Sequence, residues 1–558
     1  MLIDDGRVFD AADVQGRDSL RAMGHRTAHT DRFVLDRLPP PEFMPVFLLD
    51  RPEYRYPERL NGAVELLDRA VDEGDGERLA VVNDAGAWTY ARMRDLSDRI
   101  ARVLVEEGLE PGGRVLLRGA NTATLFAAWF AVLKAGGVAV TTMPMLRGRE
   151  IATILKRGEV AHAIVDARCR EDFEAGAAEA GTVRSTLVYH GDVGDGPLEA
   201  RAATTQGGFV PVDTHRDDPA LLAFTSGTTG APKATVHYHR DLLIPADGFS
   251  ARLLRPEADD RFVCSAPIAF TFGLGALVLF PIRARACAVT VEAPAPPALM
   301  EAIARHRATR LFTAPTAYKA MLPRLAEHDL SSLRGCVSAG EHLPAATWEA
   351  WREATGLRIV DGIGATELTH IFVSAPAEEA RAGATGRAVP GYEACVLDDE
   401  DRPMREGVGR LAVRGPTGCR YLDDPRQATY VRHGWNVTGD TYRLDAEGWF
   451  WFVARSDDMI VSSGYNIAGP EVEGALHAHP AVAECAVVGW PCPERGHVVK
   501  AVVVPAPDAE PGPELARALQ DHVKAVIAPY KYPRLVEFVA ALPKTQTGKI
   551  KRFELRPS

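Results

Sequence analysis

The sequence predicts an α/β fold in two parts, a large N-terminal domain of parallel and mixed sheets covered by helices and a small C-terminal α/β domain. In residues 1–450, short apolar β-branched runs alternate with amphipathic helical stretches. This alternation is typical of strand–helix–strand units, whose strands form parallel sheets. The sequence pattern changes from Gly439 onward, and residues 456–558 show a compact α/β pattern of their own. We therefore predict domains 1–455 and 456–558, with the boundary near Asp457.

Local signals predict the individual elements. Thr89 is a suitable N-cap for a helix that carries apolar residues at Met93, Leu96 and Ile100. The elements expected after it are a strand at 114–117, a helix at 122–134, a strand at 137–140, a helix from Arg149 and a strand at 162–166. Residues 174–208 are expected to form a surface connection with one strand at 186–189. The elements expected in the small domain are helices at 471–479 and 514–527 and strands at 483–489 and 498–504.

The composition is that of an ordinary globular protein, with 46% hydrophobic and 25% charged residues. A net charge of -11 without a basic cluster argues against a nucleic-acid partner, because phosphate binding needs clustered positive charge. The eight cysteines include no CxxC pair, which favours reduced thiols over a zinc site or disulfide framework. The N-terminus lacks a secretory pattern, and the apolar stretch 266–282 contains proline and glycine that suit a buried strand–turn–helix. We expect a cytoplasmic protein without a membrane span.

The stretch 221–233 has the composition of a phosphate-binding loop. An apolar strand runs into glycines and hydroxyl residues and then into a lysine. Glycines allow close approach to a ligand, while hydroxyl and N–H groups can surround anionic oxygens. The candidate nucleotide-binding residues are Thr225, Ser226, Gly227, Thr228, Thr229, Gly230 and Lys233. The spacing is neither that of a Walker loop nor that of a GxGxxG dinucleotide fingerprint, and composition alone is also compatible with a flexible linker.

This loop resembles the signature of the adenylate-forming superfamily, which comprises acyl- and aryl-CoA synthetases, peptide-synthetase adenylation domains and beetle luciferases. Four further segments match in the family's order and approximate spacing, and the resemblance extends from about Tyr54 to Arg552. It implies an enzyme that activates a carboxylic acid as its acyl-adenylate. The implied cofactors are ATP, Mg²⁺ and coenzyme A, and the implied partner is a small-molecule acid.

The resemblance assigns roles to residues in three of the matching segments. In the adenylate-binding segment 361–367, which includes Asp361 and Gly362, Thr366 would contact the α-phosphate and Glu367 the magnesium ion. Mg²⁺ takes one or two carboxylates together with phosphate oxygens, so a single glutamate is chemically reasonable. Asp440 would accept hydrogen bonds from the ribose hydroxyls, and Arg455 would also contact the ribose.

The remaining matches lie in the C-terminal domain. Asp457 matches the hinge residue about which that domain rotates between half-reactions. Ser463 and Gly464 match a loop that lines the coenzyme A tunnel, although Ser463 replaces a glycine of the family pattern. Lys549 matches the catalytic lysine within a ten-residue C-terminal signature.

Two segments resemble those of benzoate-type ligases and indicate an aromatic acid. Phe270 stands where many members have histidine, and 367–372 ends in the His-Ile-Phe sequence of that group. The residues expected to line a short, flat, apolar pocket are Phe270, Gly273, Thr313, Gly362, Gly364, Thr369, His370 and Ile371. Segment 28–40 resembles that of 2-aminobenzoate:CoA ligases, which favours anthranilate. His370 is interpreted either as a substrate contact or as a packed core histidine.

Three other functions stay open at this point. A stand-alone adenylating enzyme could load a carrier protein, although no carrier segment is fused to the chain. A medium-chain acyl-CoA ligase would need a deeper pocket, which Phe270 would block. A catalytically inactive scaffold would have no reason to retain all five of Lys233, Glu367, Asp440, Arg455 and Lys549. A serine hydrolase is excluded because the chain contains no GxSxG sequence. A monomer and a homodimer are equally compatible with the sequence.

Overall fold

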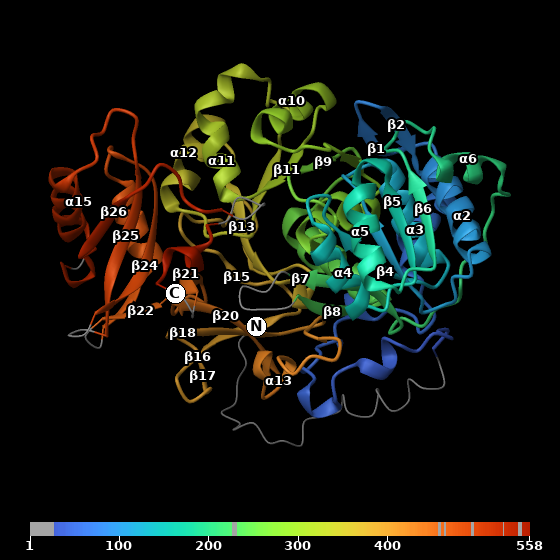
Figure 1. The fold of residues 1–558 in the computed structure, drawn as a ribbon, viewed down its shortest axis with the longest axis horizontal. Helices are drawn as coiled ribbons and strands as arrows, with labels where there is room; N and C mark the ends of the chain where they lie inside the picture. The colour runs from blue at the N-terminus through green and yellow to red at the C-terminus, as the bar shows by residue number, and fades with distance from the viewer. Residues whose placement is uncertain are drawn as a thin grey trace.

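The protein, seen in a computed structural model, is built on four β-sheets with helices packed between and around them (Figure 1). The structure describes residues 27–225, 232–455, 459–462, 465–492, 496–527, 529–544 and 550–557. In Figure 1 the C-terminal sheet lies at one end of the molecule and the first sheet at the other, with β11 (Arg310–Thr313) and β13 (Ile359–Gly364) between them. The predicted α/β class is confirmed.

The first sheet has six strands in the order β6-β5-β3-β4-β7-β8. Its strands are β3 (Arg114–Arg118), β4 (Val138–Thr142), β5 (His162–Asp166), β6 (Ser185–Tyr189), β7 (Pro219–Thr225) and β8 (Lys233–Tyr238). Its pairs are parallel except for the antiparallel β7–β8 hairpin. Because β3, β4 and β5 are buried along their whole length, this sheet anchors the hairpin firmly in the core.

The second sheet has nine strands in the order β15-β14-β13-β12-β11-β9-β10-β1-β2. Its other strands are β1 (Leu79–Asn83), β2 (Gly86–Thr89), β9 (Arg261–Cys264), β10 (Cys287–Val289), β12 (Gly335–Ser338), β14 (Ile371–Ser374) and β15 (Arg387–Ala388). The pairs from β1 through β13 are parallel apart from β1–β2. The antiparallel β13–β14 pair brings 359–364 and 371–374 together at one edge.

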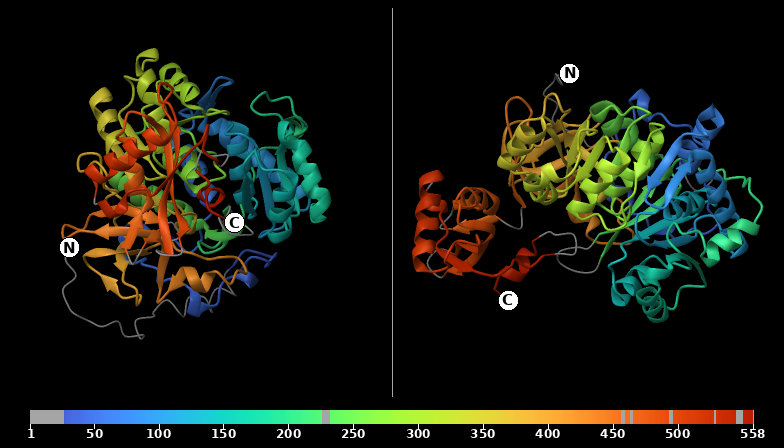
Figure 2. Two further views of the ribbon diagram at one scale, coloured as in Figure 1. Left: turned by 60° about the vertical axis from the view of Figure 1, so that its left-hand side comes forward. Right: turned by 90° about the horizontal axis from the view of Figure 1, so that it is seen from above.

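A third sheet is wholly antiparallel, in the order β17-β16-β18-β20-β19 with β21 on β20. Its strands are β16 (Glu393–Leu397), β17 (Pro403–Met404), β18 (Gly407–Arg414), β19 (Val431–Arg432), β20 (Trp435–Leu444) and β21 (Phe450–Arg455). The C-terminal sheet, in the order β23-β22-β25-β24 with β26 on β25, follows it in the chain. Its strands are β22 (Met459–Ser462), β23 (Tyr465–Ala468), β24 (Val482–Cys492), β25 (Gly496–Pro505) and β26 (Leu535–Phe538). The view from above shows this sheet and its helices set apart from the rest of the chain (Figure 2).

The helices cover these sheets. Those of the first 306 residues are α2 (Tyr90–Glu106), α3 (Ala123–Lys134), α4 (Gly148–Arg157), α5 (Arg170–Ala180), α6 (Pro197–Thr204), α7 (His239–Pro245), α8 (Thr271–Leu274), α9 (Phe280–Arg283) and α10 (Pro296–His306). The later ones are α11 (Pro315–Met321), α12 (Ala345–Thr355), α13 (Gln427–Tyr430), α14 (Gly469–His477) and α15 (Pro513–Val526). Every residue of α3 is buried. Among the described helices, none combines the length and the apolar composition needed to cross a membrane.

Local capping explains where two predicted helices begin. The Thr89 hydroxyl accepts a hydrogen bond of 3.2 Å from the Arg92 amide at the start of α2. Thr122 does the same for Leu125 at the start of α3, also at 3.2 Å. Each hydroxyl satisfies one amide that lacks a partner in the first helical turn, so both are true N-caps.

Two sequence expectations are wrong in detail. Residues 174–208 contain α6 and the end of α5 as well as β6, and α6 starts at a proline and buries only Leu198 and Ala202. Two buried positions are too few to give a helical period. The stretch 266–282 contains no strand, because β9 ends at Cys264 before the stretch begins. The stretch instead begins with a turn at 266–270, and a largely buried helical segment follows, in which a π-helical turn at Gly275–Leu279 lies between α8 and α9.

Candidate active site

The β7–β8 hairpin brings the two ends of the predicted phosphate loop together. Thr225 ends β7, Lys233 begins β8, and the two residues are register partners. The predicted loop residues that lie outside the described part of the chain are Ser226, Gly227, Thr228, Thr229 and Gly230. Because 219–223 of β7 are buried, the sheet fixes where the loop leaves and re-enters it.

Lys233 and Glu367 are linked through a buried tyrosine. The Lys233 ammonium donates to the Tyr421 hydroxyl at 3.0 Å, and this hydroxyl donates in turn to Glu367 Oε1. Tyr421 is completely buried and lies in the loop between β18 and α13. Its backbone pairs with that of Thr235 in β8 as an isolated antiparallel β-bridge. Burial and the neighbouring Glu367 raise the pKa of the Tyr421 hydroxyl, so it remains a neutral proton donor.

Glu367 lies in a short 3-10 helix, Thr366–Leu368, which ends in a strained turn. Thr369 has φ 71° and ψ -44°, and the His370 amide donates to the Leu368 carbonyl across it at 2.8 Å. This is a γ-turn of the rare, positive-φ kind, which is costly for a β-branched residue. Strain of this kind is concentrated at functional sites, where surrounding contacts hold it in place.

A buried histidine holds the strained turn. The Thr369 hydroxyl lies 3.1 Å from Nδ1 of His237, which belongs to β8. Burial lowers the pKa of His237 to about 4, so the ring is neutral at physiological pH. The turn that follows Glu367 is therefore attached to the same strand that begins with Lys233.

The predicted ribose contacts face each other on neighbouring strands. Asp440 of β20 and Arg455 of β21 are register partners, and Arg455 Nη1 donates to Asp440 Oδ1 at 3.2 Å. The Asp440 side chain is buried, whereas that of Arg455 is exposed. The carboxylate is therefore fixed, and the guanidinium can reach a ligand above it.

Two tyrosines show that the predicted nucleotide residues share one neighbourhood. The pKa of Tyr430 is raised by burial, and the charges of Glu367 and Asp440 contribute. The pKa of Tyr442 is likewise raised by burial and by the charges of Asp440 and Asp361. The Tyr430 ring lies 5.7 Å from the Tyr421 ring, and its helix α13 packs against β20, which carries Asp440, so the two groups of residues are neighbours. Burial also raises the pKa of Asp361 itself, to about 8.

His370 lies in a cluster of aromatic rings, which we call the aromatic cluster and which consists of His370, Phe249, Phe272 and Phe280. The distances from the His370 ring centroid are 5.6 Å to Phe249, 5.7 Å to Phe272 and 4.7 Å to Phe280. Neither ring nitrogen makes a well-formed hydrogen bond to a described residue, although the Phe272 backbone is near enough to affect the titration. Burial lowers the pKa of His370 to about 3, so the ring is a neutral, flat, largely apolar surface.

The other residues predicted for the acid pocket lie on three segments around this cluster. Phe270 precedes α8 and is half-buried, and the Thr313 hydroxyl at the end of β11 lies 2.7 Å from that of Ser265. Gly362 and Gly364 belong to β13, and Ile371 begins β14. A Cβ atom on Gly362 would lie 2.7 Å from the Ile371 side chain, and one on Gly273 would lie 2.2 Å from the Pro267 carbonyl oxygen. Close packing therefore explains both glycines.

The residues predicted to act from the C-terminal domain are outside the described part of the chain. These residues are Asp457, Ser463, Gly464 and Lys549. Their flanking strands are described, since β22 and β23 pair through Ser462 and Tyr465 on either side of 463–464.

Comparison with known proteins places these features in a family. A family model described as AMP-binding enzyme matches residues 67–420, and one described as AMP-binding enzyme C-terminal domain matches residues 471–549. The chain belongs to the AMP-binding enzyme family. Its members include a benzoate–CoA ligase of Thauera aromatica, which is 36% identical over 518 residues, covering 90% of this chain and 97% of the relative.

Solved structures of similar enzymes agree with this assignment. An anthranilate CoA ligase, AuaEII, in complex with anthranoyl-AMP superposes with a TM-score of 0.85 at 33% identity, covering 90% of this chain and 98% of the other. A benzoate CoA ligase from Burkholderia xenovorans LB400 superposes with a TM-score of 0.81 at 31% identity, covering 89% of this chain and all of the other. Both comparisons span the large and the small part of the fold.

Sequence reasoning missed Tyr421, His237 and Phe249. Tyr421 stands between Arg420 and Leu422 in a segment that matched no predicted motif, and nothing local marks it as a partner of Glu367. His237 lies in a buried strand, where a histidine usually has a structural role. Phe249 lies in the π-helical segment Ala246–Leu254, far from Phe270 in sequence. All three become visible only when distant segments are brought together.

A magnesium ion fits this AMP-binding enzyme only together with its substrate. Within the described residues, no group of three or more histidine, cysteine, aspartate or glutamate side chains is arranged to hold a metal ion. Glu367 is instead a single buried carboxylate. Mg²⁺ usually takes one or two carboxylates and completes its shell with water and phosphate oxygens, so this arrangement is suitable for a metal that arrives with ATP.

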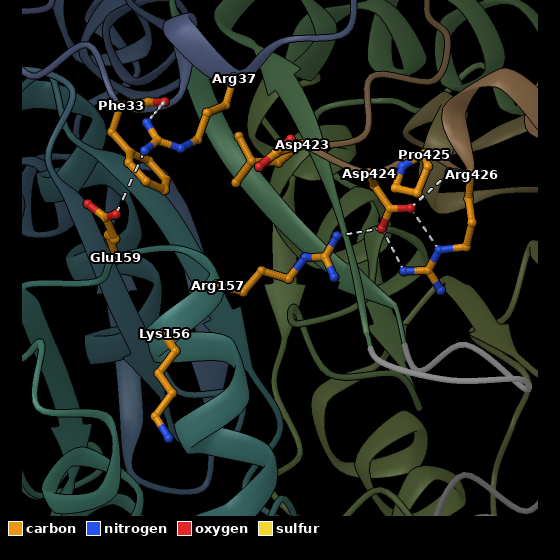
Figure 3. Close-up of a pocket in the computed structure, with 10 residues that line it drawn as sticks. Phe33, Arg37, Lys156, Arg157, Glu159, Asp423, Asp424, Pro425 and Arg426 are labelled. Atoms are coloured by element: carbon orange, nitrogen blue, oxygen red, sulfur yellow. Dashed lines mark hydrogen bonds and ion pairs between the residues drawn. The ribbon is translucent and has the colours of Figure 1, made fainter.

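A surface hollow of about 500 Å³ lies elsewhere, between α4, the segment near Phe33 and the loop before α13 (Figure 3). Arg157 and Arg426 both reach the Asp424 carboxylate in this hollow. Arg37 lies 3.9 Å from Glu159. Since these charges already have partners and none is a predicted site residue, the candidate active site is the region around Lys233, Glu367 and Asp440.

Proposed function

We propose that the chain is an ATP-dependent aryl acid:CoA ligase that forms aryl-CoA, AMP and pyrophosphate through an aryl-adenylate. The observation that carries this proposal is the Lys233–Tyr421–Glu367 chain, which lies in one neighbourhood with the Asp440–Arg455 pair. A cation, a buried carboxylate and a ribose-binding carboxylate together suit the phosphates and sugar of ATP. Both benzoate and anthranilate CoA ligases are among the relatives.

The acid substrate is proposed to be 2-aminobenzoate or benzoate. The flat, neutral ring of His370 and the phenylalanines around it favour a planar aromatic guest over a flexible chain. Phe272 and Phe270 are only half-buried and offer faces on which such a ring could stack. A medium-chain acid would need a long apolar channel in place of these rings.

In the first half-reaction, the substrate carboxylate attacks the α-phosphorus of ATP and pyrophosphate leaves. Both reactants are negative, so the enzyme must chiefly position them and neutralise charge. Lys233 and the hydroxyl loop that it closes would bind the phosphates, Thr366 would contact the α-phosphate, and Asp440 and Arg455 would hold the ribose. A magnesium ion bound by Glu367 and phosphate oxygens would withdraw negative charge from the phosphates. Lys549 would be positioned by the small domain at the reacting carboxylate.

In the second half-reaction, the thiolate of coenzyme A attacks the adenylate carbonyl carbon and AMP leaves. Lys549 is proposed to act in the first half-reaction and the loop at Ser463 and Gly464 in the second. We propose that domain 456–558 rotates against domain 1–455 at Asp457 between the two steps.

The test incubates the purified protein with ATP, Mg²⁺ and either 2-aminobenzoate, benzoate, salicylate or octanoate, with and without coenzyme A. We expect pyrophosphate with the aryl acids and continuous turnover to aryl-CoA only with coenzyme A. A single burst of pyrophosphate, with no further turnover when coenzyme A is added, would indicate that the acyl acceptor is a carrier protein instead. Turnover with octanoate but with none of the aryl acids would indicate an aliphatic substrate in place of an aromatic one. The absence of pyrophosphate with every acid would contradict the proposed ligase activity.

The role of Lys549 has a separate test. The Lys549→Ala variant is expected to lose adenylate formation by about a thousandfold, because an opposite charge near 4 Å is worth about 4 kcal/mol at an effective dielectric of ~20. Thioester formation from pre-made aryl-adenylate should persist. An equal loss in both steps would contradict the proposal that Lys549 acts in adenylate formation but not in thioester formation.

A further inference from the structure

The Tyr421 hydroxyl occupies the position between the Lys233 ammonium and the Glu367 carboxylate. It accepts from one at 3.0 Å and donates to the other. The three residues come from β8, the 3-10 helix after β13 and the loop before α13. A cation and a carboxylate would normally attract one another into direct contact. Here a neutral phenol separates them.

Several contacts fix Tyr421 in this position. Its amide donates to Gln427 Oε1 at 2.9 Å, and its ring meets the Tyr430 ring edge-on at 5.7 Å between centroids. The adjacent Arg420 is buried and donates to Asp241 at 2.7 Å. The ring also lies 4.7 Å from the Lys233 ammonium, close enough for a cation–π contact. Tyr421 is therefore a rigid spacer.

The alternative to this spacer would impair ligand binding. If Lys233 and Glu367 paired directly, each would cancel the charge that the other presents to ATP. The phosphates would lose a cation, and the metal that accompanies them would lose a carboxylate. A neutral bridge avoids both losses, because it hydrogen-bonds to each group without neutralising either one.

We propose that Tyr421 is a positioning residue that prevents direct pairing of Lys233 and Glu367, and so keeps the lysine available to phosphate and the carboxylate available to magnesium. This inference rests on the proposed function for the identity of the nucleotide. It assigns Tyr421 no contact with substrate and no proton transfer.

The test compares Tyr421→Phe with Tyr318→Phe. Tyr318 is a matched control, since it is also fully buried and its hydroxyl lies within hydrogen-bond distance of two backbone carbonyls, those of Leu311 at 3.2 Å and Val337 at 3.0 Å. Calorimetry would measure binding of a non-hydrolysable ATP analogue with and without Mg²⁺. In Tyr421→Phe, we expect Mg²⁺ to improve the affinity about tenfold less than in the unchanged protein, as expected for one charge-assisted hydrogen bond. The same loss in Tyr318→Phe would show a general packing effect and overturn the proposal.

A second variant tests direct pairing itself. In Tyr421→Phe/Glu367→Gln, the lysine has no carboxylate to pair with. Direct pairing should weaken the Mg²⁺-independent binding of the ATP analogue in Tyr421→Phe. In the double variant we expect this binding to return to the level of the unchanged protein. If it stays as weak as in Tyr421→Phe alone, the lost hydroxyl acts in another way and the proposal fails.

These measurements do not depend on the acid substrate. A wrong choice of acid would appear as absent turnover while the analogue still binds. A wrong role for Tyr421 would appear as unchanged coupling between Mg²⁺ and the analogue in Tyr421→Phe.

Discussion

Lys134 and Lys233 show two ways of placing a lysine inside this protein. Lys134 ends α3 with no exposed surface, and its ammonium lies 2.6 Å from Asp68 and 2.6 Å from Asp98. Lys233 begins β8, is half-buried, and has a phenol as its hydrogen-bond partner. The ammonium of Lys134 therefore pairs directly with two carboxylates, whereas the Tyr421 hydroxyl lies between the ammonium of Lys233 and the nearby carboxylate of Glu367.

We interpret this difference as that between a structural charge and the proposed ligand-binding charge. A buried ion pair must satisfy its own charges, because no ligand or solvent can do so. A ligand-binding cation must instead remain partly uncompensated until the ligand arrives. Among the described residues, the hydrogen-bond partner of Lys233 is the neutral hydroxyl of Tyr421. The turn that follows Glu367 is likewise held by a neutral group, the His237 ring.

Removing the structural charge should have the largest effect on stability. Lys134→Met would leave Asp68 and Asp98 buried together without a cation, and we expect a loss of about 3–5 kcal/mol in the free energy of unfolding. Denaturant titration measures it. The control is the triple variant with Asp68→Asn and Asp98→Asn, which should recover most of the loss. A loss below about 1 kcal/mol in Lys134→Met would mean that the triad is not a structural requirement.

Removing the functional charge should affect catalysis more than stability. Lys233→Met is expected to lower adenylate formation by up to about a thousandfold, the value of one charge near 4 Å at an effective dielectric of ~20. Its unfolding free energy should change by less than about 1 kcal/mol, because the partner left behind is a neutral hydroxyl. Pyrophosphate release and denaturant titration give the two numbers. Lys156→Met, an exposed lysine paired with Glu179, is the control and should change neither. A large stability loss in Lys233→Met would erase the distinction between the two lysines.

The sequence predicts the local half of this comparison better than the spatial half. Thr89 and Thr122 cap the expected helices, and the expected strands at 114–117 and 162–166 are present, since each depends on neighbouring residues. Lys233 and Glu367 were identified through motifs that carry a chemical pattern. The partners of a charge are set by tertiary packing, so no local signal joins Tyr421 to Glu367 across 54 residues.

The backbone at Thr369 illustrates the same limit. A threonine at φ 71° contradicts its intrinsic preference, and a sequence-based assignment has no reason to expect it. The contacts of Thr369 with His237 and of His370 with its aromatic neighbours help to hold the turn in place. Such local disagreements are expected at a functional site, where binding geometry outweighs propensity.

The neutral groups of the functional region should give it a pH dependence. Burial lowers the pKa of His237 from its ordinary value of 6.5 to about 4, so on acidification the unfolded chain binds the proton first. Stability is therefore full above pH 6.5, falls as the pH drops, and stops falling on this account below about pH 4. At pH 5 the loss due to His237 is about 2 kcal/mol. Other buried histidines with lowered pKa values, including His370, add to the total fall.

His237→Gln isolates this contribution, because the amide can still hydrogen-bond to the Thr369 hydroxyl but cannot be protonated. We expect the variant to lose about 2 kcal/mol less than the unchanged protein between pH 7 and pH 5 in denaturant titrations. The surface variant His328→Gln should leave that difference unchanged. If His237→Gln follows the pH profile of the unchanged protein, His237 takes up its proton at the same pH in the folded and the unfolded chain. The functional region would then acquire a buried positive charge near pH 5, and the contrast with the charged surroundings of Lys134 would be lost.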